Sequence, residues 1–129
     1  MLRRLELPRD SYGKLMHRAA ELKIDFLSTP FDPDSLALLI GLGLPCLKIG
    51  SGDLTNAPLL LEAARSGRDI ILSTGMADVP EIEEALGVLA FGYAGGTVTP
   101  GRAAFRKAFA DDGTRSLLAR RILITRCWC

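Results

Sequence analysis

Small hydroxyl residues follow three apolar, strand-like runs of this chain. The first run leads to Thr29, the second leads through Lys48 to Ser51, and the third ends at Ser73. Parallel strands of α/β proteins end at one common edge, where barrels and open sheets keep their chemistry. Hydroxyl groups, exposed backbone N–H groups and a lysine at that edge could hold a phosphate or a carboxylate. We therefore expect the function of this chain at the carboxyl ends of its strands.

Lys48 is the most informative of these residues, because its strand neighbours Leu47 and Ile49 are apolar. A lysine that points into a barrel interior is costly unless an anion meets its charge. Asp53 follows in the next turn and could accept a proton, hold a metal-bound water or orient a sugar hydroxyl. Capping of the following helix is the simpler role for any single Ser, Thr or Asp. Three hydroxyl groups in register with one lysine favour a ligand site.

Apolar residues with helical spacing separate the strand-like runs. The predicted strands are residues 26–32, 47–54 and 70–76, and ILIT at 122–125 could begin a fourth. The first predicted helix runs from about 11 to 22. Three further helices are predicted to start after Asp32 or Asp34, after Asn56 and after Asp78, and one or two short helices lie between 103 and 118. Helical crossovers require parallel, adjacent strands. The pattern predicts a piece of a parallel α/β sheet, which could belong either to an α/β barrel or to an open doubly wound sheet.

The composition is that of a globular protein. Of 129 residues, 48% are hydrophobic and 24% are charged, and 16 basic against 15 acidic residues leave a net charge of +1. This balance argues against nucleic acid or membrane partners. No stretch resembles a signal peptide or a membrane span, so we expect a cytoplasmic location. Cys46, Cys127 and Cys129, with His17 as the only histidine, do not complete a zinc site, and we expect no metal ligands in this chain.

Residues 92–101, GYAGGTVTPG, contain four glycines and a proline. Such a composition breaks regular structure. We expect a flexible surface insertion here, within a single incomplete α/β domain that spans residues 1–129.

Three ordered motifs together resemble the N-acetylneuraminate (sialic acid) synthase family and its legionaminate, pseudaminate and spore-coat relatives. They are FLSTPFD at 26–32, KIGSGDLTNAPLL at 48–60 and IILSTGMADVPEIEEAL at 70–86. The resemblance implies a transferase of carbohydrate biosynthesis that condenses phosphoenolpyruvate with an N-acetylated amino sugar, such as N-acetylmannosamine, and releases phosphate. It places this chain at about strands 3 to 5 and the start of strand 6 of a TIM barrel. It also implies a homodimer.

The same resemblance implies roles for individual residues. Thr29, Lys48, Ser51 and Ser73 would contact the phosphate or carboxylate of phosphoenolpyruvate, and Lys48 would neutralise its charge. Asp53 stands where many members carry a glutamate that takes part in proton transfer or sugar positioning. Lys48 and Asp53 are therefore the expected catalytic residues.

The chain also departs from the family pattern. Members use a divalent ion, Mn²⁺ or Mg²⁺, bound by two histidines that this sequence does not contain. Residues 126–129, RCWC, replace the expected continuation of a strand of the type LLHCT, which suggests a reading-frame slip. We expect the chain to be inactive alone. A non-catalytic remnant and a phosphate-binding α/β module are the alternatives, and the amino sugar stays open.

Overall fold

The computed structural model describes residues 7–125 of the chain. The predicted end segment 126–129, with Cys127 and Cys129, lies outside the described residues. The described part mixes helices and strands, as the sequence predicts, but two helices open it without a strand between them, and three successive helices precede its last strand. In chain order the elements are α1 (Arg9–Glu21), α2 (Pro33–Gly41), β1 (Cys46–Ile49), the 3-10 turn η2 (Ser51–Asp53), α3 (Ala57–Arg65), β2 (Asp69–Ser73), α4 (Val79–Ala94), α5 (Arg102–Ala110), α6 (Asp112–Arg121) and β3 (Ile122–Thr125).

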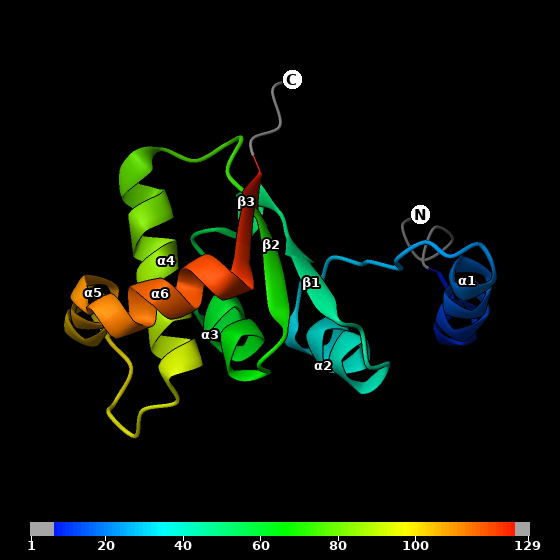
Figure 1. The fold of residues 1–129 in the computed structure, drawn as a ribbon, viewed down its shortest axis with the longest axis horizontal. Helices are drawn as coiled ribbons and strands as arrows, with labels where there is room; N and C mark the ends of the chain where they lie inside the picture. The colour runs from blue at the N-terminus through cyan, green and yellow to red at the C-terminus, as the bar shows by residue number, and fades with distance from the viewer. Residues whose placement is uncertain (1–6, 126–129) are drawn as a thin grey trace.

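The three strands form one parallel sheet in the order β1-β2-β3 (Figure 1). Lys48 pairs with Ile71, and Ser73 pairs with Thr125. The parallel, adjacent arrangement of the second, third and fourth predicted strands is therefore confirmed. The assignment of these strands to positions in a barrel stays a prediction.

The first predicted strand, residues 26–32, is wrong as a strand. The segment is extended, and its only backbone hydrogen bond to the sheet in the described chain joins the Lys48 N–H to the Ser28 carbonyl at 3.2 Å. Ile24 and Leu27, which flank its start, are 60% and 40% exposed. A strand needs a continuous ladder of hydrogen bonds and a covered face, and this segment has one bond and little cover.

Side-chain caps start four of the described helices; three of them are predicted from the sequence, and the fourth is Asp111 at α6. Asp32, rather than Asp34, caps α2 and exchanges hydrogen bonds with Ser35. The backbone N–H of Ser35 donates to the Asp32 carboxylate and lowers its pKa. Asp78 and Glu81 form the equivalent capping box at α4, and Asn56 caps α3. Each cap satisfies backbone N–H groups that the first helical turn leaves unpaired.

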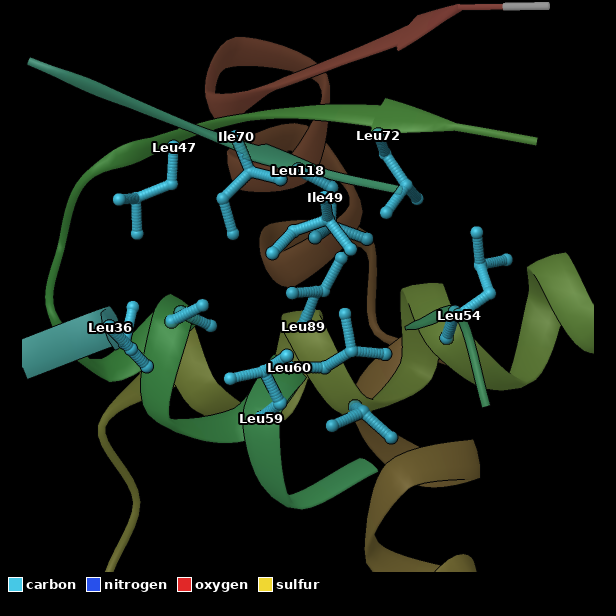
Figure 2. Packing of buried hydrophobic residues seen from close by; sticks show 14 of the residues in the cluster. Leu36, Leu47, Ile49, Leu54, Leu59, Leu60, Ile70, Leu72, Leu89 and Leu118 are labelled. Carbon is cyan, nitrogen blue, oxygen red and sulfur yellow. The ribbon is translucent and has the colours of Figure 1, made fainter. Parts of the chain in front are cut away.

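The hydrophobic core fills the space between one face of the sheet and the helices. Leu47 and Ile49 of β1 and Ile70 and Leu72 of β2 are almost fully buried. Figure 2 shows them directed toward Leu60 of α3 and other helical side chains. Helix α1 lies at the end of the extended segment (Figure 1), and its partly buried Tyr12 and Met16 pack against this core.

The predicted insertion at 92–101 begins later than the sequence suggests. Helix α4 continues through Ala94, and Gly95 ends it with a left-handed φ of 65°. Gly92 is a buried helical residue that packs against α3, since a Cβ added to it would lie only 2.5 Å from the Cβ of Ala64. Close helix packing, not flexibility, accounts for this glycine.

Replacement of Gly92 by alanine should destabilise the protein. The added methyl would collide with Ala64 and come within 3.2 Å of the Leu61 carbonyl oxygen. We expect overpacking of about 1–3 kcal/mol to exceed the gain in helix propensity of at most about 1 kcal/mol. Urea unfolding measures the free energy of unfolding. Gly13→Ala in α1, where nothing lies within 4 Å of the added Cβ, is the matched control and should not destabilise. Equal stability of Gly92→Ala and the parent would contradict the packing account.

Candidate functional site

The alternation of side chains along the strands separates a core face from a second face of the sheet. Leu47 and Ile49 point to the core, so Lys48 between them points the other way. Its partner Ile71 and the next residue across, Leu123, lie in the same row. Leu123 is 61% exposed, so this face lacks the cover that the helices give the core. We call this side the open face; its strand residues are Cys46, Lys48, Asp69, Ile71, Ser73, Leu123 and Thr125.

Lys48 supplies the positive charge of the open face. Its side chain is half-buried, and within residues 7–125 no carboxylate lies at ion-pair distance from its ammonium. An ammonium without a protein counter-charge attracts an anion. Lys48 can therefore neutralise a ligand charge without first giving up an ion pair.

Ser51 and Asp53 form a tight turn directly after β1. The Asp53 N–H donates to the Gly50 carbonyl at 3.1 Å. The Asp53 Oδ2 lies 3.4 Å from the position that a Cβ on Gly50 would occupy, so the carboxylate folds back over the end of the strand. Both Ser51 and Asp53 are half-buried. The turn places a hydroxyl and a possible proton acceptor next to the strand that carries Lys48.

Ser73 ends β2 and is joined to the end of β3. The Ser73 and Thr125 hydroxyl oxygens lie 3.2 Å apart. The Thr74 N–H donates to the Thr125 carbonyl at 3.1 Å. Ser73 and Thr74 are 8% and 5% exposed. Ser73 is one of the residues predicted for the site, whereas Thr125 is not, although the same signal, a hydroxyl residue at the end of an apolar run, marks it.

Thr29 belongs to the extended segment beside β1. It follows Ser28, whose carbonyl accepts the Lys48 N–H, and it is half-buried next to the buried Pro30. The residues predicted to bind phosphoenolpyruvate therefore come from segments that neighbour one another in space. Lys48 lies within β1 and Ser73 ends β2, whereas Ser51 lies in the turn after β1 and Thr29 in the extended segment beside it. Their roles stay predictions.

Two cavities of the described structure are not lined by these residues. The larger, of about 530 Å³, lies between α4, α5 and the start of α3, and its lining includes Phe105 and Phe109. Glu84 and Arg102 form a 4.0 Å ion pair at this cavity. The smaller cavity lies between α6 and β3. The candidate anion site is thus an edge of an open sheet rather than an enclosed pocket.

The residues that the structure describes do not fit the divalent metal that the family resemblance implies. No three His, Cys, Asp or Glu side chains in this part of the chain lie close enough together to hold an ion. His17 projects from α1 into solvent and lies 3.3 Å from Glu21. Cys46 is half-buried, and burial raises the pKa of its thiol.

Across residues 7–125, no helix is long and apolar enough to cross a membrane.

Known proteins share both the sequence and the fold of this chain. The N,N'-diacetyllegionaminic acid synthase of Campylobacter jejuni is 51% identical over 89 residues, which are 69% of this chain and 27% of that protein. The crystal structure of the spore coat polysaccharide biosynthesis protein SpsE of Bacillus subtilis superposes with a TM-score of 0.68 and 25% identity, over 95% of this chain and 27% of that one.

An N-acetylneuraminic acid (sialic acid) synthetase of Leptospira borgpetersenii, crystallised with citrate, also gives a TM-score of 0.68, with 28% identity over 94% of this chain and 44% of that one. The chain spans about a quarter of the length of the curated relatives that it matches. The NeuB family model matches residues 1–128. On this match, the chain belongs to the NeuB family.

Proposed function

We propose that this chain forms the phosphoenolpyruvate-binding edge of a nonulosonic acid synthase, a transferase of carbohydrate biosynthesis. The observation that carries the proposal is the position of Lys48. It lies on the open face of a parallel sheet, without an ion-pair partner in the described chain, and beside segments that bear Thr29, Ser51 and Ser73. A lysine on the same sheet edge as segments that bear hydroxyl groups suits a ligand that carries several negative charges.

Phosphoenolpyruvate carries a phosphate and a carboxylate, and its condensation with an amino sugar keeps charge on both groups until phosphate leaves. In the proposed reaction, the C3 carbon of the enol attacks the aldehyde carbon of the open-chain N-acetylated amino sugar, which becomes an alcohol. Water adds at C2, and the C2–O bond to phosphate breaks. Lys48 and the hydroxyl groups hold the anion and its developing charge. Asp53, in the turn that follows β1, is the proposed proton acceptor.

The similar proteins support this proposal. The Campylobacter relative is named for diacetyllegionaminic acid synthesis, and the Leptospira relative, a sialic acid synthetase, was crystallised with citrate, a carboxylate anion. The amino sugar that reacts is left open. The homodimeric state and the cytoplasmic location implied by the sequence stay predictions.

Loss of the Lys48 charge should weaken binding of phosphoenolpyruvate. We expect Lys48→Ala to reduce the affinity at least about tenfold, because a hydrogen bond to a charged group contributes about 1.5–3 kcal/mol. Isothermal titration calorimetry with phosphoenolpyruvate measures the dissociation constant of the full chain. Lys107→Ala on the exposed side of α5 removes the same charge away from the sheet and is the matched control. An unchanged affinity in Lys48→Ala would place the anion elsewhere.

The chain alone should bind phosphoenolpyruvate but should not release phosphate from it. No described residues form the metal centre that the family resemblance implies, so we expect no phosphate release with N-acetylmannosamine and Mn²⁺ present. Binding should be equal in Mn²⁺ and in excess chelator, because Lys48 rather than a metal supplies the charge. A colorimetric phosphate assay measures the first result and calorimetry the second. Sugar-dependent phosphate release would show that the chain is a complete catalyst. If phosphoenolpyruvate binds with an affinity that neither the sugar nor Lys48→Ala changes, a general phosphate-binding module would be favoured instead.

A further inference from the structure

We infer that Thr125 is a positioning residue that orients the Ser73 hydroxyl toward the bound anion. The inference rests on the proposed function of this edge and adds to it a residue on a third strand. Thr125 ends β3, and its partner across the sheet is Ser73 at the end of β2. Both side chains therefore lie on the open face, the face that also carries Lys48.

The contact between the two side chains is direct. The Ser73 Oγ and the Thr125 Oγ1 lie 3.2 Å apart, and either atom has the geometry to donate. A hydroxyl group has one proton and two acceptor lone pairs. If the Ser73 proton points to an anion, the remaining partner of its oxygen must be a donor, and Thr125 is the hydroxyl in place to be that donor. In the resulting series of hydrogen bonds, Thr125 donates to Ser73 and Ser73 donates to the anion.

The direction of these hydrogen bonds decides the role of each residue. The Ser73 hydroxyl donates to the anion, whereas the Thr125 hydroxyl donates to the Ser73 oxygen. Hydrogen bonds in such a chain polarise one another, so a donor behind Ser73 strengthens the bond that Ser73 makes to a negative charge. It also selects one rotamer of a side chain that otherwise rotates freely.

Thr125 is itself held in place by two features. Its carbonyl accepts the backbone N–H of Thr74 at 3.1 Å, and the Thr74 hydroxyl lies 3.5 Å from the same oxygen. Threonine is branched at Cβ, which restricts χ1 in an extended strand. A buried Thr74 thus anchors the end of β3, and the end of β3 in turn aims Ser73.

The test is a double-mutant cycle of phosphoenolpyruvate affinity, measured by calorimetry on the full chain. Thr125→Val keeps the shape and the branched Cβ but removes the hydroxyl, and we expect it to weaken binding about 2- to 10-fold, the range for one neutral hydrogen bond. Thr125→Ser keeps the hydroxyl and should restore the parent affinity. In a Ser73→Ala background, Thr125→Val should have no further effect, because the group that it orients is gone.

Two results would overturn the inference. The first is a parent-like affinity of Thr125→Val; if its melting temperature is lowered at the same time, the contact is structural alone. The second is an equal loss of affinity from Thr125→Val with and without the Ser73 hydroxyl, which would mean that Thr125 contacts the anion directly.

Lys48→Ala, measured in the same series, separates this inference from the proposed function. If Lys48→Ala weakens binding and Thr125→Val does not, the anion site stands and the positioning role fails. If Ser73 and Thr125 are coupled while Lys48→Ala binds normally, the positioning role stands and the assignment of Lys48 fails. Absence of phosphoenolpyruvate binding by the parent chain overturns both.

Discussion

The two-residue alternation of a strand is the constraint on which this structure depends. In β1 it sends Leu47 and Ile49 into the core and leaves Lys48 on the opposite face. A register shift of one residue would bury the ammonium among leucines and expose the two apolar side chains. The burial of the core face therefore fixes the position of the cation. The same packing that stabilises the sheet decides where an anion could bind.

The helices act on the candidate site through the ends of the strands. Asp78 caps α4 five residues after Ser73 ends β2, and η2 links β1 to the Asn56 cap of α3. These short connections leave Ser51 and Ser73 little freedom relative to the helices that follow them. Close packing of α4 on α3, which Gly92 permits, then fixes the two connections relative to each other. Helix packing far from the open face thus contributes to the geometry at its edge.

The sequence predicted best the features that depend on local chemistry. The capping residues Asp32, Asn56 and Asp78 bond to N–H groups within their own first turn, so their signal is complete in a few residues. The prediction that Gly92 belongs to a flexible insertion was wrong, because this glycine is required by close packing against Ala64 in another helix. The prediction of a strand at 26–32 was wrong, because a strand, unlike a helix cap, forms only when a second segment of the chain supplies a ladder of hydrogen bonds. Thr125 carries the same local signal as Ser73, a hydroxyl residue at the end of an apolar run, but its contact with Ser73 exists only when β3 lies beside β2.

The open face explains why anion binding and catalysis are separate expectations for this chain. Two charges 4 Å apart attract by about 1 kcal/mol in bulk water and by about 4 kcal/mol at the effective dielectric of a protein surface. Leu123 in the row of Lys48 is 61% exposed, so within residues 7–125 water reaches the face on which the ligand would lie. Lys48 can attract an anion under these conditions, because the protein has to supply only one positive charge opposite the negative charge of the ligand. Stabilisation of the charge that develops in a transition state needs donors fixed around the reacting atoms and water excluded from them. A second layer over the open face would supply both, and it would act on the same lysine.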